Sequence, residues 1–242
     1  AFLEQITGMD AELERYLARV AGYCLTGSTR EQVFFFFHGA GANGKSVFLH
    51  TIATAMGSYA ATATLDAFMA SGQSRHLTEL AGLRGARLVL VPETEDGRGW
   101  AEARIKAVTG GEKVRANYMR QDHFEFTPAF KLVVAGNHRP ELKNVGEAMR
   151  RRLHLVPFDV TIRAEDRDPQ LPERLRSELD GILGWMIAGC AEWQRIGLAP
   201  PERVVSAGEA YFADEDVVGQ WIAEQCVTGP AYAATSAALF QS

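Results

Sequence analysis

Apolar residues in this chain gather in short runs separated by longer helical patterns. The run Val33–Phe37 contains four consecutive phenylalanines. A strand with one face in water would expose every second side chain of such a run, so it indicates a strand that is covered on both faces. Apolar runs at 88–91, 131–135 and 153–158 have the same character. We therefore expect an α/β fold with a mainly parallel central sheet flanked by helices.

Helical spacing of apolar residues appears between and around these runs. Residues 1–27 show an apolar helical face, and the patterns at 47–56, 75–83 and 100–109 indicate further helices, the last one closed by Gly110–Gly111. Residues 112–127 alternate about a polar tip near 120–122, which predicts an inserted β-hairpin. Three helices are expected in the segment after residue 172. This pattern divides the chain into an N-terminal helical segment (1–27), a core (28–162) and a C-terminal helical region (163–242).

Composition is that of an ordinary globular protein, with 47% hydrophobic and 23% charged residues among 242. The sequence contains no apolar run near the ~20 residues of a membrane span, and its first residues do not form a signal peptide. The odd count of three cysteines disfavours a disulfide framework. A cytoplasmic location without a membrane partner is the expectation.

Charge is distributed unevenly along the chain. Residues 1–158 carry 19 Lys/Arg and 16 Asp/Glu, a net of +3, whereas residues 159–242 carry 6 and 14, a net of −8, which together give the overall −5. A nucleic-acid surface needs only a local basic stripe, so the negative total does not exclude DNA as a partner.

A glycine-rich motif follows the phenylalanine strand directly. It fits Gly-x-x-x-x-Gly-Lys-Ser, and its residues are Gly39, Ala40, Gly41, Ala42, Asn43, Gly44, Lys45 and Ser46, with Val47 beginning the helix. Backbone N–H groups of such a loop surround phosphate oxygens, the lysine reaches the outer phosphates, and the serine hydroxyl ligates Mg²⁺. The motif between a buried strand and a helix predicts a nucleotide phosphate site.

Polar residues after two other apolar runs complete a candidate active site. Glu93 and Glu95 follow the run at 88–91, and an acid there can hold Mg²⁺ and polarise the attacking water. We assign Glu93 the main role and keep Glu95 as a second candidate. Asn137 follows the run at 131–135, where its amide either orients water at the outermost phosphate or caps the loop before Pro140.

Two basic groups lie outside this motif set. Arg150, Arg151 and Arg152 precede the last core strand; they form either a solvated face or a source of an arginine for a neighbouring subunit's phosphate. Six Lys and Arg residues against two Glu lie within 98–120. Basic residues beside an aromatic at a hairpin tip are typical of single-stranded DNA binding, and the candidates are Lys113, Arg115, Tyr118 and Arg120.

Taken together in this order, the motifs "GANGKS", "ETE", "KAVTGG", "GNH" and "RRRLHLVPF" resemble the superfamily 3 helicase domain of phage, prophage and plasmid primase-helicases, which poxvirus primase-helicases share. The resemblance implies an AAA+-like core that uses ATP and Mg²⁺, forms a hexameric ring and moves on single-stranded or forked DNA. It places Lys45 and Ser46 in Walker A, Glu93 in Walker B, Asn137 at the sensor, and Arg151 or Arg152 as the trans-acting arginine. It also implies a primase module as a partner, in the same polypeptide or in trans.

Two other functions share the phosphate loop. An ATP-controlled DNA-binding or loading factor would use the hairpin and arginines without unwinding. A small-molecule kinase would have no use for an Asn-ended strand or an arginine run. A GTPase is disfavoured because the guanine-reading Asn-Lys-x-Asp motif is absent from the sequence.

Overall fold

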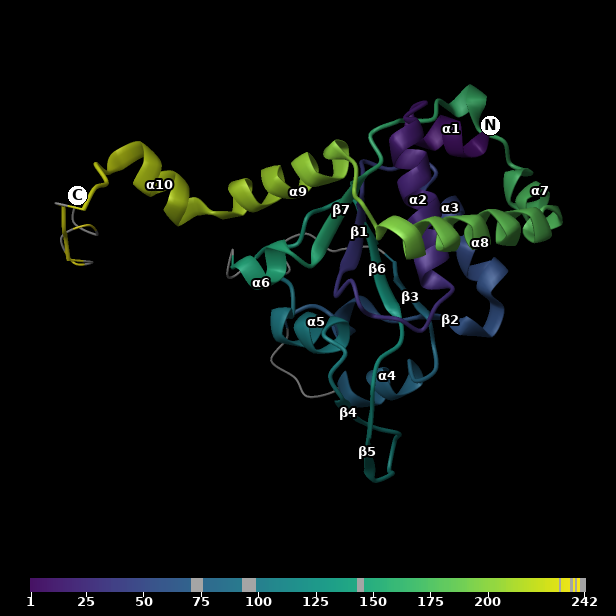
Figure 1. The fold of residues 1–242 in the computed structure, drawn as a ribbon, viewed down its shortest axis with the longest axis horizontal. Helices are drawn as coiled ribbons and strands as arrows, with labels where there is room; N and C mark the ends of the chain where they lie inside the picture. The colour runs from purple at the N-terminus through teal and green to yellow at the C-terminus, as the bar shows by residue number, and fades with distance from the viewer. Residues whose placement is uncertain are drawn as a thin grey trace.

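The structure is a computed structural model that describes residues 1–70, 76–92, 99–142, 146–230, 232–235, 237 and 239. Figure 1 labels its elements. The described strands are β1 (Phe34–His38), β2 (Ala60–Thr62), β3 (Leu88–Val91), β4 (Val114–Asn117), β5 (His123–Phe126), β6 (Lys131–Gly136) and β7 (Leu153–Pro157). The described helices are α1 (Phe2–Thr7), α2 (Ala11–Cys24), α3 (Lys45–Met56), α4 (His76–Gly82), α5 (Glu102–Thr109), α6 (Glu147–Arg150), α7 (Leu171–Ser177), α8 (Leu179–Ile196), α9 (Glu202–Glu215) and α10 (Val217–Gln225).

Five strands form the central sheet in the order β2-β3-β6-β1-β7, and each neighbouring pair is parallel. The four phenylalanines of β1 are each 0% exposed, which confirms a strand covered on both faces. The strand begins one residue later than the apolar run, at Phe34, and extends to His38. The predicted α/β fold with a mainly parallel sheet is confirmed.

The two faces of the sheet pack against different helices (Figure 1). Phe35 and Phe37 belong to the cluster formed with α2, α3 and α8, while Phe34 and Phe36 belong to the cluster formed with α4, α5 and α9. This division follows from the period of two along a strand, which sends successive side chains to opposite faces. The phenylalanine run therefore fills both core layers at once.

The N-terminal helical pattern is interrupted. Gly8 ends α1 in the left-handed conformation with φ 68°, and the Asp10 side chain accepts hydrogen bonds from the N–H groups of Glu12 and Leu13 to cap α2. Asp10 is a standard N-cap residue, so the break has a local signal. The N-terminal helical segment thus consists of two helices.

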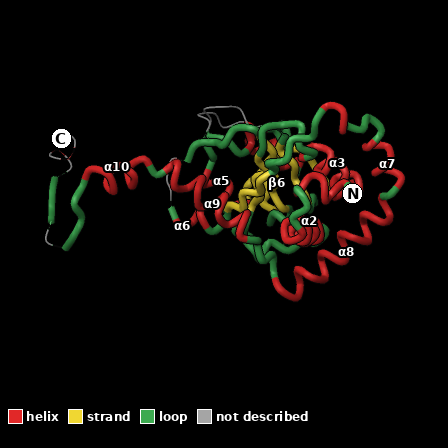
Figure 2. The backbone as a smooth tube through the Cα atoms, turned by 90° about the horizontal axis from the view of Figure 1, so that it is seen from above, coloured by secondary structure: helices red, strands yellow, loops and turns green. Residues whose placement is uncertain are grey.

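The C-terminal region contains four described helices instead of the expected three. Asp216 ends α9, and its side chain accepts a hydrogen bond from Gly219 N at 2.9 Å, which starts α10. Helix α9 packs along β7, whereas α10 extends away from the rest of the molecule (Figures 1 and 2). None of the helices in the described ranges is long and apolar enough to cross a membrane.

Candidate functional site

The glycine-rich loop joins β1 to α3 at the carboxyl end of the sheet. Gly41 and Gly44 have φ of 100° and 83°, and Ala42 also has a positive φ of 51°. These conformations turn the loop inward, and glycine adopts them at little cost. The Asn43 side chain donates to Phe158 O at 3.0 Å and accepts from Lys45 N at 3.4 Å, so the loop is tied to the chain beyond β7.

The N-terminal helix supports this loop from behind. A Cβ added to Gly44 would lie 2.3 Å from Ile6 Cγ2 and 3.4 Å from the ring of Phe2. Gly44 is therefore required both by its positive φ and by the close approach of α1. Only the first requirement could be inferred from the motif, because the α1 contact joins residues 38 or more positions apart.

Lys45 is the centre of the site. Its side chain is buried, and Nζ donates to Gly39 O at 2.5 Å and to Asn137 Oδ1 at 3.1 Å. Burial lowers the pKa of this ammonium from its ordinary value. Lys45 and Asn137 come together because β1 and β6 are neighbouring parallel strands whose carboxyl ends meet at one edge of the sheet.

A cavity of about 510 Å³ opens over these groups. Residues 41–47 line it together with Asn137 and the ends of β3 and β6. The helix α3 begins in it, and the N-cap Gly44 offers no side-chain oxygen to the first-turn N–H groups. A concave loop, a helix N-terminus and a buried lysine fit the phosphates of a nucleotide.

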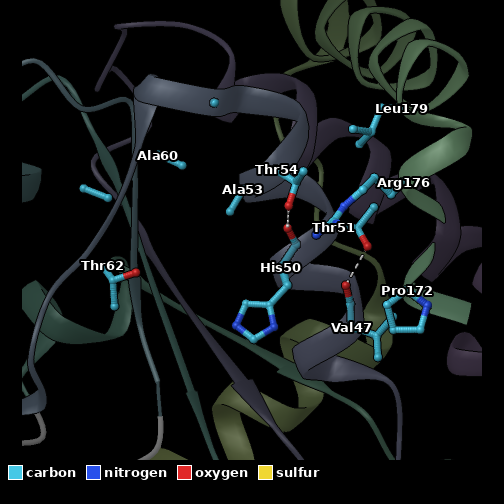
Figure 3. Close-up of a pocket in the computed structure, with 12 residues that line it drawn as sticks. Val47, His50, Thr51, Ala53, Thr54, Ala60, Thr62, Pro172, Arg176 and Leu179 are labelled. Atoms are coloured by element: carbon cyan, nitrogen blue, oxygen red, sulfur yellow. Dashed lines mark hydrogen bonds between the residues drawn. The ribbon is translucent and has the colours of Figure 1, made fainter. Parts of the chain in front are cut away.

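A neighbouring cavity of about 700 Å³ shares Val47, His50 and Thr62 with the first one. In Figure 3 the lining residues of α3 lie in the middle, those of the edge strand β2 lie on one side, and Pro172, Arg176 and Leu179 from α7 and the start of α8 lie on the other. Thr51 and Thr54 hydrogen bond to the carbonyls of Val47 and His50 and so satisfy their hydroxyls within the helix. The two cavities therefore lie next to each other at the start of α3 and the edge strand β2.

A third cavity, of about 560 Å³, lies on the other side of the loop. Phe2 and Gln5 from α1, Gly44 and Val47 from the loop region, and a segment spanning 162–174 line it. None of the α1 and 162–174 residues was a sequence candidate. No sequence motif indicates them, because they come from two segments that lie far apart in the sequence, before and after the phosphate loop.

The predicted acids Glu93 and Glu95 lie outside the described residues. Pro92, directly before them, lines the phosphate cavity at the end of β3. Among the described residues, no group of three or more His, Cys, Asp or Glu is arranged to hold a metal ion. Of the two predicted Mg²⁺ ligands, Ser46 lines the cavity, and Glu93 is not described.

The arginine run is separated by the fold into three environments. Arg152 is buried and donates to Ala148 O at 2.8 Å and to Thr109 Oγ1 at 3.3 Å, and burial lowers its pKa. Arg150 lies 5.0 Å from the ring centroid of Phe212 on α9. Arg151 is exposed. Of the two candidates for a trans-acting arginine, only Arg151 offers its guanidinium to another molecule.

The arginines and the phosphate loop lie at opposite ends of the strands. Phe34 N donates to Arg152 O at the start of β1, whereas Gly39 follows the end of β1. A five-residue strand at ~3.3 Å per residue separates the two ends by about 16 Å. Arg151 therefore stands far from the phosphate cavity of its own chain.

The predicted hairpin is present as the two-stranded sheet β4-β5. Lys113, Arg115, Tyr118 and Arg120 are all exposed on it. Tyr118 stacks on Phe124 with ring centroids 5.3 Å apart, and Arg115 lies opposite Glu125 in the strand register. Two other basic residues of 98–120 are engaged within the chain, because Arg104 donates to the carbonyl of Ala67 and Lys106 pairs with Glu102.

The chain is similar to one family model and to several viral proteins named as putative helicases. Residues 37–152 match the model of a family of unknown function, DUF5906. The chain is 26% identical to "Putative helicase 022R" of Frog virus 3 over 91% of its length, and 24% identical to "Putative helicase L207/L206" of Acanthamoeba polyphaga mimivirus over 93%. It spans about a quarter of the length of these curated relatives, 25% of each.

Solved structures share the fold. The apo structure of the NrS-1 C-terminal region aligns with 90% of this chain and 50% of that chain at a TM-score of 0.63 and 13% identity. A second apo structure of this region (305–718) aligns with 95% of this chain and 58% of that one at a TM-score of 0.61, also at 13% identity. The structural match establishes the fold, and the viral relatives support a helicase-like domain.

Proposed function

We propose that this chain is the ATP-dependent motor domain of a DNA helicase of the superfamily 3 type. One observation carries the proposal: Lys45 Nζ lies between Gly39 O and Asn137 Oδ1 beneath a concave glycine loop at the start of α3. An ammonium at this place neutralises the outer phosphates of a nucleoside triphosphate, and the neighbouring amide orients the attacking water. The similarity to viral proteins named as helicases supports the choice of a motor over a kinase.

In this proposal, some residues bind the phosphates and others position the groups that take part in hydrolysis. Backbone N–H groups of the loop and of the first turn of α3 hold the phosphates, while Lys45 leaves the Gly39 carbonyl to contact them. Ser46 and Glu93 would hold Mg²⁺, with Glu95 as the alternative acid. Mg²⁺ held there would neutralise charge on the phosphates. The cavity that Phe2 and Gln5 line beside the loop is the place for the nucleotide base.

For the assembly, the proposed arrangement is a ring in which Arg151 of one subunit enters the phosphate site of the next subunit. Its support is the exposure of Arg151 and its distance from its own loop. For DNA binding, the proposed contacts are made to single-stranded DNA by the hairpin residues Lys113, Arg115, Tyr118 and Arg120. Hexamer formation and a primase partner stay predictions from the resemblance.

The deciding experiment measures ATP hydrolysis with and without oligo-dT for the parent and for Lys45→Ala. The variant should lose at least about a hundredfold in kcat, because it removes a preorganised charge from the site. Arg195→Ala, which removes an exposed charge at the end of α8, is the matched control and should behave like the parent. A folded Lys45→Ala protein that hydrolyses ATP at the parental rate would contradict the phosphate site.

The proposed DNA contact is tested by titrating labelled oligo-dT at several salt concentrations with the double variant Arg115→Ala/Arg120→Ala. Its affinity for oligo-dT should fall, and the slope of log affinity against log salt should flatten by up to about 1.4, since each neutralised phosphate of a single strand contributes about 0.7. Strand displacement on a forked duplex then separates a helicase from a loading factor. If the salt dependence of binding is unchanged, the DNA-binding surface lies elsewhere on the molecule.

A further inference from the structure

A buried tyrosine on α9 joins two segments that lie beyond the candidate site. Tyr211 is 0% exposed, and its hydroxyl accepts a hydrogen bond from Trp100 Nε1 at 3.0 Å and donates to the carbonyl of Pro140. Trp100 lies downstream of β3, and Pro140 lies three residues beyond Asn137. A buried hydroxyl that both donates and accepts fixes the positions of both partners.

The same face of α9 holds the segment after Asn137 at two more points. Asp214 accepts from Arg139 Nη1 at 3.2 Å, and Glu215 accepts from Leu142 N at 2.7 Å. Residues 211, 214 and 215 are spaced i, i+3 and i+4, so they share one side of the helix. Residues 139–142 are therefore held along their length by a single turn of α9.

Trp100 connects this junction to the strand that leads into the phosphate loop. Its ring meets Phe34 and Phe36 edge-on, with centroids 5.2 and 5.7 Å apart. Its backbone N donates to Glu141 O at 3.1 Å. The hydroxyl of Tyr211 thus lies between the core of β1 and the segment that follows Asn137.

We propose that Tyr211 is a positioning residue for nucleotide hydrolysis, which acts by holding Asn137 against Lys45. This inference rests on the proposed function. Asn137 stands directly after β6, so the direction of its amide is set by the strand before it and by the held segment 139–142 after it. Asn137 faces the cavity, and its Oδ1 is 3.1 Å from Lys45 Nζ. A looser segment would let the amide turn away from the phosphates without altering the loop that binds them.

The test variant is Tyr211→Phe, which keeps the ring and removes the hydroxyl from Trp100 and Pro140. We expect kcat for ATP to fall about tenfold with KM nearly unchanged, because the loss of a buried hydrogen bond acts on Asn137 and not on the phosphate loop. Tyr16→Phe is the matched control. Tyr16 is also 0% exposed, and its hydroxyl is 2.6 Å from His154 Nδ1, but it packs on the opposite face of the sheet.

A double-mutant cycle and hydrogen exchange separate positioning from general loss of stability. In the Asn137→Ala background, Tyr211→Phe should lower kcat little further, since both changes act on one group. The amides of Trp100 and Leu142 should exchange faster in Tyr211→Phe than in Tyr16→Phe. If Tyr211→Phe does not fold, Glu215→Ala, which releases Leu142 N from a partly exposed carboxylate, takes its place and should lower kcat in the same way.

A kcat equal to that of the parent, or a loss fully additive with Asn137→Ala, would overturn the positioning role. Equal losses in Tyr211→Phe and Tyr16→Phe would overturn it too, because a general loss of rigidity would then explain both. A parent protein that hydrolyses no ATP contradicts the proposed function instead, and this is seen before any variant is compared.

Discussion

Two buried lysines show how residue identity alone fails to separate structure from function. Lys131 on β6 donates to the carbonyls of Thr26, Ser28 and Ala129, and burial lowers its pKa to about 8. Lys45 is buried to a similar degree but faces a cavity. The first lysine ties the end of α2 to the sheet, and the second is available to a ligand. The motif around Lys45 made the distinction possible from sequence.

A half-buried histidine on β7, His154, gives the fold a predictable response to acid. Burial lowers the pKa of His154 to about 4, from 6.5 for the free side chain. The unfolded chain therefore binds more protons between these values, so the free energy of unfolding falls as pH drops from 6.5 towards 4, by about 3 kcal/mol in total from this group. Urea unfolding at pH 7 and pH 5 should show a smaller pH effect in His154→Gln than in the parent.

The matched control is Tyr16→Phe, which removes the hydrogen-bond partner at 2.6 Å but keeps the imidazole. Its stability should be lower at both pH values, while its pH effect stays close to the parental one. An equal pH effect in His154→Gln and the parent would assign the acid response to other groups.

The arginine run shows what sequence could not resolve at this scale. Arg151 and Arg152 are adjacent and chemically identical, yet one is exposed and the other donates to Ala148 O and Thr109 Oγ1. Arg152 directly precedes β7, and its guanidinium reaches the last residue of α5 and a carbonyl of α6. Thr109 lies 43 positions before Arg152 in the sequence, so only the folded chain shows which arginine is held in the core.

At the scale of elements, most of the fold could be predicted because each segment carries its own signal. The phenylalanine run, the closing glycines after Thr109 and the alternation of the hairpin are local patterns. Contacts between distant elements carry no such signal. The approach of α1 to Gly44 and the Tyr211 junction depend on residues brought together only by the folded chain.

The crossing of α2 and α8 is the clearest of these contacts. A Cβ on Gly22 would lie 2.1 Å from Cys190 N, and one on Gly189 would lie 2.0 Å from Ala18 O. The two backbones therefore touch. Neither glycine has a positive φ, so their role is to allow this close approach.

Gly189→Ala should consequently destabilise the protein by about 1–3 kcal/mol or more, because the obstructing atoms belong to backbone and cannot rotate away. Gly184→Ala is the matched control on the same helix, where an added Cβ meets nothing within 4 Å. It should be neutral or stabilising by up to about 1 kcal/mol, since alanine favours a helix. Thermal unfolding of both variants checks the pair. Equal melting temperatures would show that the crossing tolerates a wider separation.

At the scale of the whole molecule, two features extend from the core: the β4-β5 hairpin and α10 (Figure 1). The phosphate cavity lies at the carboxyl end of the sheet, and Arg151 precedes β7 at the other end. This separation favours an arginine that acts between molecules, because about 16 Å of strand lies between it and its own loop. The chain would then complete its active site only in an assembly.

Mixing two inactive variants tests that arrangement. Lys45→Ala keeps Arg151, and Arg151→Ala keeps Lys45, so a randomly mixed ring has both groups intact at about a quarter of its interfaces. ATP hydrolysis should therefore recover when the two proteins are combined and should peak near an equal ratio. Combining Lys45→Ala with the double variant Lys45→Ala/Arg151→Ala is the control, and it should recover nothing because every loop lacks its lysine. If native mass spectrometry confirms mixed assemblies and yet no ratio restores hydrolysis, Arg151 does not act across the subunit boundary. The exposed guanidinium would then belong to a DNA or partner surface.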